Sequence, residues 1–528
     1  MRVTGTGHAS VFVETSAGSV LCDPWVTPAY FGSWFPFPDN SELDWDRFGQ
    51  ADYLYVSHLH RDHYDPATLA KHIRKDITVL LPEYPTNELK DALISLGFSK
   101  FVQPESGEVI DLDGLQVMIH ALVSPTDGPI GDSALWLRDG DTTLLNQNDA
   151  RPTDLSTFAD LGHVDAHLLQ YSGAIWYPMV YDLPENAKRA FGKQKRARQF
   201  DRTLRYIDDL KASYVFPTAG PPCFLDPELW QINDIFGDEG NIFPDQWDFE
   251  KFMAAEGRDN SRLLIPGSVA NLAAEGCPVT HPVPDAEVER IFVEKESYLR
   301  AYQERKLPAL EAEKATWSHP EIDIFAELKK WFEPLMAEAN RMSDGVGGPV
   351  RFTAEDAIRG DVDLVLDFPN REVRLYDDEK VRYRFRTGRG LVEHLIHIGE
   401  GDWVNSLFLS CRFTANRVGP YNEYVYTFFK CLSEERINYA EGWYAEQSTD
   451  VEDTTLDGWV VQRRCPHLKA DLSKFGQIED GVLTCQMHGW KWRLDDGKCL
   501  TSVGHPIRSA PEGAEPIPPP RTNPTVRD

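Results

Sequence analysis

Two short segments of the sequence contain residues of the types that bind metals. The C-terminal segment reads Cys465-Pro466-His467 and, seventeen residues later, Cys485-Gln486-Met487-His488, so each half offers one thiolate and one imidazole. A 2Fe–2S cluster with cysteines on one iron and histidines on the other needs this set. Zinc also accepts two cysteines and two histidines, but such zinc sites usually group the cysteines apart from the histidines. We therefore predict a 2Fe–2S cluster on Cys465, His467, Cys485 and His488, with structural zinc as the alternative.

The N-terminal segment follows a strand-like run, Asp52–Ser57, and reads His58-Leu59-His60-Arg61-Asp62-His63. Alternate residues of extended chain point to the same side. His58 and His60 are therefore expected to bind one metal, while Asp62 and His63 turn towards a second. A polar loop after a strand is the alternative, but four ligand types within six residues favour a metal site.

The surrounding elements predict an α/β multidomain chain. From Val3 to about Val215, short β-like runs such as Leu115–Leu122 alternate with amphipathic helical stretches such as Gln199–Lys211, which is typical of sheets covered by helices. After this region the pattern changes from alternating strands and helices to other combinations of elements. The predicted units are an α/β domain at 1–284, a helical connector at 285–345, a small α+β module at 346–435, an all-β domain at 436–510 and a Pro-rich tail at 511–528.

The C-terminal segment resembles Rieske domains, including the flanking Leu468, Gly481 and His488-Gly489-Trp490. Respiratory-chain Rieske proteins have an extra cysteine on each cluster loop, and the two form a disulfide. The comparable positions here are Ala470 and Met487, so this bridge is not expected. Fewer constraints and fewer hydrogen bonds to sulfur imply a lower reduction potential, as in clusters that supply electrons to oxygenases.

The N-terminal segment resembles the metallo-β-lactamase fold, over residues 1–270, which implies an αββα sandwich. That family completes its sites with a middle His, a bridging Asp and a last His. Asp149 fits the bridging position, and Asp127, or else His120, is expected at the middle one. The last position, in Phe216–Gly220, offers no ligand. We therefore expect an impaired second metal position and one complete site of His58, His60, Asp149 and a fourth group.

Two histidines and a carboxylate with open positions match non-haem Fe(II) oxygenases. Zinc cannot change its oxidation state, so a redox cluster beside a zinc hydrolase would serve no chemistry. We therefore predict catalytic iron at His58, His60 and Asp149, with dioxygen as cosubstrate. Gly5-Thr6-Gly7 lacks the third glycine of a dinucleotide site, so NAD(P)H is expected to act through a separate reductase or a ferredoxin. His8, His163 and His167 lie outside any ligand spacing and are expected to be ordinary histidines.

The combination resembles the CMP-N-acetylneuraminate hydroxylase family, for example in Gln147–Pro152, Gln246–Phe249 and Leu395–Cys431. The Rieske domain comes last here, as in UDP-N-acetylmuramate hydroxylases, and not first as in the animal enzymes. The resemblance implies a monooxygenase that converts an N-acetyl to an N-glycolyl group on a peptidoglycan precursor. The alternatives are another amino sugar or amide substrate, a lactamase-type hydrolase with a redox-sensing Rieske domain, and an electron carrier.

The chain is acidic, with 84 acidic and 54 basic side chains among 528 residues and a net charge of −30. This balance argues against nucleic acid and against anionic membranes. Without an apolar spanning run or export signal, a cytoplasmic location is expected. A homo-oligomer is also expected, because Rieske oxygenases often pass electrons between subunits.

Residues 188–205 are conspicuously basic. Such cations suit the two phosphates of a nucleotide sugar. A solvated helix face and a ferredoxin-docking patch are the alternatives. The predicted substrate-binding residues are Lys188, Arg189, Lys195, Arg196, Arg198 and, stacking on the base, Tyr177.

Overall fold

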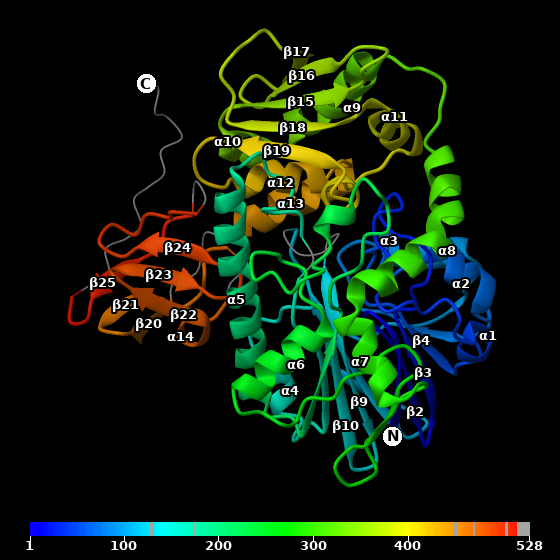
Figure 1. Ribbon diagram of the computed structural model, residues 1–528. Coiled ribbons are helices and arrows are strands. Elements are labelled where there is room, and N and C mark those ends of the chain that lie inside the picture. Colours follow the sequence, from blue (N-terminus) through cyan, green and yellow to red (C-terminus); the bar gives the residue numbers. More distant parts are fainter. Residues whose placement is uncertain (126–130, 174, 447–451, 468–469, 502–504, 515–528) are drawn as a thin grey trace.

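A pair of facing β-sheets forms the N-terminal half of the chain (Figure 1). The computed structural model describes residues 1–125, 131–173, 175–446, 452–467, 470–501 and 505–514. One sheet has the order β14-β13-β1-β2-β3-β4-β5-β6 and the other β12-β11-β10-β9-β8-β7. The strands of the first are β1 (Arg2–Gly7), β2 (Ser10–Thr15), β3 (Gly18–Cys22), β4 (Tyr53–Tyr55), β5 (Thr78–Leu80), β6 (Lys100–Val102), β13 (Val269–Asn271) and β14 (Val279–Thr280). Those of the second are β7 (Val109–Leu112), β8 (Leu115–Leu122), β9 (Asp132–Asp139), β10 (Thr142–Asn148), β11 (Ala166–Gln170) and β12 (Tyr214–Thr218).

The side-chain alternation of these strands explains the layering. Val11 and Val13 of β2 pack with Val117 of β8 between the sheets, whereas Phe12 and Met118 point outwards. Helices cover both outer faces, and these are α1 (Trp45–Phe48), α2 (Pro66–His72) and α3 (Glu88–Ser95) on one side and α5 (Glu185–Leu210) and α6 (Gln246–Ala255) on the other. Short α4 (Ser156–Ala159) and η1 (Trp230–Ile232) lie in the connections. The predicted αββα sandwich is confirmed.

The segment predicted as a connector, 285–345, divides between two cores. Phe292 of α7 (Asp285–Val293) and Leu299 of α8 (Lys295–Ala315) pack on the sandwich. By contrast, α9 (Ile324–Glu338) and α10 (Asn340–Val346) join the core of the next sheet. This α+β module has the strand order β17-β16-β15-β18-β19. Its other elements are β15 (Pro349–Glu355), β16 (Val362–Asp367), β17 (Glu372–Leu375), β18 (Tyr383–Gly388), β19 (Phe413–Arg417), α11 (Arg389–Ile398), the π-helix η2 (Val404–Phe408), α12 (Glu423–Lys430) and α13 (Glu434–Glu446).

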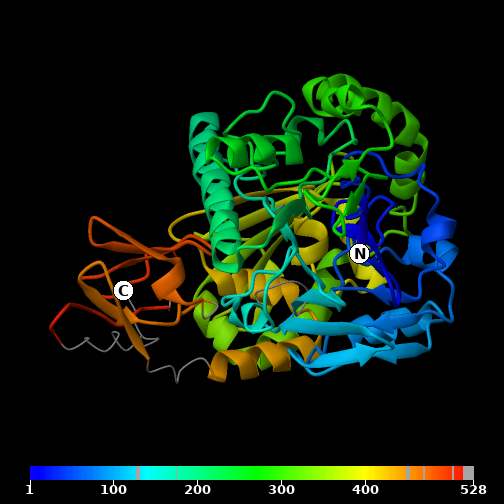
Figure 2. The ribbon, with the colours of Figure 1, turned by 90° about the horizontal axis from the view of Figure 1, so that it is seen from below.

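The C-terminal domain consists of short antiparallel strands, β20-β21-β25 in one sheet and β22-β23-β24 in another. Their bounds are β20 (Asp453–Leu456), β21 (Trp459–Gln462), β22 (Gly476–Glu479), β23 (Val482–Cys485), β24 (Trp490–Arg493) and β25 (Ser509–Pro511), with α14 (Leu472–Phe475) between them. In both views this domain lies beside α5, which separates it from the sandwich (Figures 1 and 2). No helix among the described residues has the length and apolarity needed to cross a bilayer.

Helix α5 approaches the segment around Gly240 so closely that Gly192 faces backbone. A Cβ built on Gly192 would lie 1.8 Å from the Gly240 carbonyl oxygen. Since α5 also borders the C-terminal domain, this contact helps to set where that domain sits.

We predict that Gly192→Ala destabilises the protein by about 3 kcal/mol, because the new methyl must displace backbone. The matched control is Gly442→Ala in α13, where a Cβ meets nothing within 4 Å. That change should stabilise by about 0.5–1 kcal/mol, because alanine is the better helix former. Thermal unfolding of both variants checks this, and equal midpoints would contradict the packing argument.

Candidate metal centres

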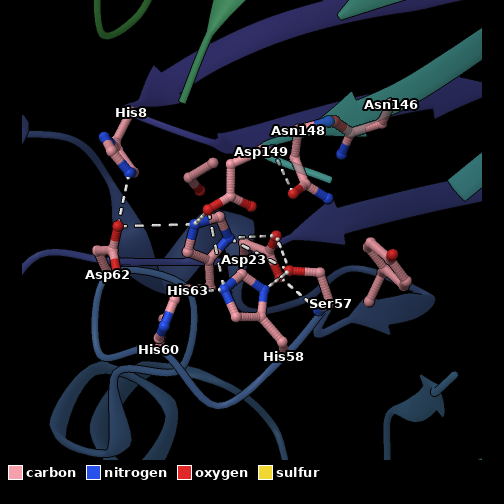
Figure 3. Close-up of polar contacts among 12 residues, drawn as sticks. His8, Asp23, Ser57, His58, His60, Asp62, His63, Asn146, Asn148 and Asp149 are labelled. Carbon is pink, nitrogen blue, oxygen red and sulfur yellow. Dashed lines mark hydrogen bonds and ion pairs between the residues drawn. The ribbon is translucent and has the colours of Figure 1, made fainter. Parts of the chain in front are cut away.

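The loop after β4 brings His58 and His60 together with Asp149, which follows β10 (Figure 3). His58 Nε2 lies 2.8 Å from His60 Nδ1 and 3.9 Å from Asp149 Oδ2. One ligand atom from each of the three residues lies within 4.8 Å of the others. The loop and Asp149 meet because β4 and β10 lie in facing sheets whose polar loops converge at this end.

A second group of possible ligands adjoins the first and consists of His8, Asp62 and His63. His8 Nε2 lies 2.8 Å from Asp62 Oδ2. His63 Nε2 lies 3.6 Å from Asp62 Oδ2 and 3.5 Å from Asp149 Oδ2, so the Asp149 carboxylate stands between the groups. His8, expected to be an ordinary histidine, belongs to this group. It lies fifty residues before His58, and no local spacing connects the two.

Polar neighbours turn these side chains towards a common centre. His63 Nδ1 lies 2.9 Å from Asp23 Oδ2, and the same carboxylate accepts hydrogen bonds from the Ser57 backbone N–H and hydroxyl at 2.7 Å each. An ionised carboxylate only accepts, so Nδ1 of His63 carries the proton and Nε2 faces inwards. Tyr30 donates its hydroxyl to Asp62 Oδ1 at 2.6 Å. Metal-bound histidines commonly have such partners behind them, and the residues fit a metal site in this respect.

The electrostatics of the site also suit a cation. Burial lowers the pKa of His58 and His60, so both imidazoles are neutral and able to ligate. Burial opposes ionisation of Asp62 and Asp149, but His63 and the other histidines hold the pKa of each carboxyl below its usual value. Burial likewise opposes charge on His63, yet Asp149 and Asp62 raise its pKa well above normal. His63 therefore keeps a positive charge beside the two carboxylates, where a bound metal would supply that charge instead.

His120 and His167 lie outside both groups. His120, in β8, packs its ring 5.5 Å from that of Phe158 and belongs to neither group. Asp127 lies outside the described residues. His167 is buried with Nε2 2.8 Å from Gln147 Oε1, and burial lowers its pKa to about 3. Asn405, on η2 of the α+β module, forms a side-chain hydrogen bond with His60. Neither this residue nor Asp23 is predictable from local spacing, because only the fold brings them to the loop.

The C-terminal domain assembles its own group. The buried thiols of Cys465 and Cys485 contact each other, and a hydrogen bond from Cys465 lowers the pKa of Cys485. The rings of His467 and His488 lie 4.9 Å apart, and that of His467 stacks on Trp490 at 4.2 Å. Each of two loops thus contributes one thiol and one imidazole, the set that a 2Fe–2S cluster requires.

Helix α5 ties this group to the loop that carries Asp149. Arg202 donates to the Met487 carbonyl at 2.8 Å, within the loop between Cys485 and His488. The Tyr206 hydroxyl donates to the Pro152 carbonyl at 2.8 Å and lies 3.5 Å from Met487 Sδ. Only Ala150 and Arg151 separate Asp149 from Pro152. The two groups are therefore connected through a few residues of one chain.

The basic residues of 188–205 lie on α5 and have different surroundings. Arg189 pairs with Asp238, Arg196 with Asp234 at 2.9 Å and Asp248 at 3.0 Å, and Lys188 with Glu185 at 3.3 Å. No ion pair of Lys195 or Arg198 occurs in the described part of the chain. Burial lowers the pKa of Lys195, and Arg151, Arg198 and Arg202 lower it further. Lys195 Nζ lies 5.8 Å from the ring centre of Tyr177.

Comparison with known proteins assigns the chain to a family. A family model described as "Rv3818-like, SCP2-like domain" matches residues 324–446, and a Rieske [2Fe-2S] domain model matches residues 450–509. The chain is 53% identical over 519 residues to the Rieske 2Fe-2S iron-sulfur protein Rv3818 of Mycobacterium tuberculosis (strain ATCC 25618 / H37Rv), covering 97% of this chain and 100% of that protein. The chain belongs to this Rv3818-like Rieske family. This match confirms the predicted Rieske domain. A Rieske domain in turn supports the predicted 2Fe–2S cluster.

More distant similarities of this Rv3818-like chain extend to hydroxylases. It is 33% identical over 241 residues to the cytidine monophosphate-N-acetylneuraminic acid hydroxylase of Danio rerio, covering 42% of this chain and 38% of that enzyme. The structure of CmlA, a diiron beta-hydroxylase from Streptomyces venezuelae, is similar at a TM-score of 0.32 and 18% identity, covering 51% of this chain and 52% of that one.

We predict that Asp23→Asn weakens metal binding at the N-terminal site roughly 10- to 100-fold, because His63 loses the carboxylate that fixes its orientation. Titration of metal-depleted protein measures the affinity. Asp113→Asn, on the exposed turn between β7 and β8, is the control and should bind as the wild type does. Unchanged affinity in Asp23→Asn would exclude the orienting role.

Proposed function

We propose that the chain is a Rieske-coupled non-haem iron monooxygenase that hydroxylates the N-acetyl group of UDP-N-acetylmuramate to N-glycolyl. The observation that carries this proposal is the connection between the Cys–His group and the His–carboxylate group through Tyr206, Pro152 and Met487. A redox cluster so connected favours a redox metal over zinc. The similarity to a hydroxylase of an N-acetylated sugar nucleotide supports the reaction class.

His58, His60 and Asp149 would hold the iron and leave positions open for dioxygen and substrate. Bound iron would supply activation of dioxygen, with electrons from the cluster. A small pocket opens on His58 and is lined by Leu59, Tyr84, Thr86, Glu88, Leu89 and Gly131. The apolar part of its lining, Leu59 and Leu89, suits an acetyl methyl group held in a productive orientation.

Electrons are proposed to reach the cluster from a ferredoxin or a reductase that uses NAD(P)H. The contacts through α5 provide a connection within one chain, so transfer between the two centres need not depend on the homo-oligomer expected from the sequence.

Lys195 and Arg198 are the best candidates to hold the substrate diphosphate. Their positive charges are not neutralised by ion pairs in the described part, and Arg151, two residues after Asp149, lies close enough to lower the pKa of Lys195. Diphosphate bound there would lie near the iron ligand. Lys188, Arg189 and Arg196 already pair with carboxylates, which makes them weaker candidates.

Incubation of the protein with UDP-N-acetylmuramate, a reductase system and ¹⁸O₂ should yield product carrying one ¹⁸O atom, detected by mass spectrometry. His58→Ala should abolish product while retaining the cluster absorbance. If only another amino sugar were hydroxylated, that sugar would replace UDP-N-acetylmuramate as the proposed substrate. Hydrolysis without dioxygen would favour a lactamase-type hydrolase.

Lys195→Ala and Arg198→Ala should each raise KM for UDP-N-acetylmuramate about tenfold, the effect of one lost charge-assisted contact, with a smaller change in kcat. Arg189→Ala, which removes an exposed side chain that pairs with Asp238, is the control and should leave KM unchanged. A fall in kcat at constant KM would instead assign these cations to the neighbouring cluster.

A further inference from the structure

We propose that His8 is a metal ligand, and that with Asp62 and His63 it forms a second metal position beside the first, sharing Asp149. The N-terminal centre would then be dinuclear, although the sequence leaves the last ligand of the fold missing. This inference rests on the proposed iron site at His58, His60 and Asp149 and specifies how many ions that site holds.

The position of His8 suits a ligand. It lies in the tight turn between β1 and β2 with a φ of 55°, a left-handed conformation that is uncommon for a residue other than glycine. Its side chain is 5% exposed. The ring packs edge-on at 4.9 Å from Trp25, which fixes its plane, and Nε2 points at Asp62. A strained, buried imidazole facing a carboxylate is costly unless the arrangement serves a function.

His8 also lies where the missing ligand would be. The Ala219 N–H donates to the His8 carbonyl at 3.1 Å, so the turn rests on the end of β12, within Phe216–Gly220. A side chain has no room on Gly220, because a Cβ there would lie 2.1 Å from the Tyr171 hydroxyl. The β1–β2 turn therefore brings an imidazole to a strand end whose own residues, Phe216–Gly220, include no metal-binding type.

The donor atoms of this position are otherwise unused. Asp149 Oδ1 is buried and forms no hydrogen bond in the described part of the chain. His63 Nε2 is also buried and faces the carboxylates of Asp62 and Asp149, at 3.6 and 3.5 Å. Tyr30 occupies Asp62 Oδ1, which leaves Oδ2 for the centre between His8 and His63. Two imidazoles and two carboxylates, one of them shared, are a suitable set for iron. The bridging place of Asp149 follows from its distances of 3.5 Å to His63 and 3.9 Å to His58.

The experiment measures metal content per cluster in the purified full chain, with acid-labile sulfide as the internal standard for the cluster. The wild type should contain two metal ions beyond the cluster iron. His8→Ala should lose one of them and keep its sulfide. The control His163→Ala, which removes an exposed histidine that pairs with Ser213, should keep both.

His8→Gln separates ligation from positioning and guards against a packing defect in His8→Ala. Glutamine can still donate a hydrogen bond to Asp62 but is a poor ligand, so it should also lose one ion. Retention of both ions in His8→Gln would overturn the inference and leave His8 as a positioning residue. A wild-type protein with one metal ion beyond the cluster iron would overturn this inference and leave the proposed function standing. A wild-type protein with no such ion would overturn both the inference and the proposed function.

Discussion

The Asp149 carboxylate, largely enclosed among imidazoles, is the constraint on which the rest of the structure depends. An ionised carboxylate in a protein interior is unstable unless positive charge or hydrogen bonds compensate it. Here it stands between His58 and His63, and together with Asp62 it holds a proton on His63. The centre is therefore arranged around negative charge that only a cation can balance well. The two sheets supply that arrangement, since β10 carries Asp149 and β4 leads to the histidines.

Helix α5 connects the loop that carries Asp149 to the Cys–His group of the Rieske domain. One of its faces packs on the sandwich, while Arg202 and Tyr206 contact the loop between Cys485 and His488. Tyr206 also bonds to Pro152, three residues from Asp149. The same helix therefore contacts both the Rieske domain and the loop that carries Asp149. The α+β module contributes from the other side, where Glu423 of α12 lies 3.4 Å from His467 and Asn405 contacts His60.

Local spacing predicted much of this architecture. The His58–His63 and Cys–x–His motifs lie within single loops. The alternation of strands and helices predicted sheets covered by helices, and the resemblance to the metallo-β-lactamase fold implied the sandwich. Contacts between distant segments were not accessible in the same way. His8 reaches the site only because β1 pairs with β2 beneath the loop, and the expectation of an ordinary histidine followed from its isolation in the sequence. The basic run at 188–205 is evident in the sequence, but the sequence does not show towards which groups its side chains point. The fold turns Arg189 and Arg196 towards carboxylates and Arg202 towards the cluster loop.

A single turnover tests whether the two centres act as one redox unit, as we propose. Chemically reduced protein, freed of reductant, is mixed with UDP-N-acetylmuramate and dioxygen while cluster absorbance and product are followed together. Cluster oxidation and hydroxylated product should appear at the same rate, and this rate should not change with protein concentration. Cluster oxidation without product, or product formed while the cluster stays reduced, would contradict it.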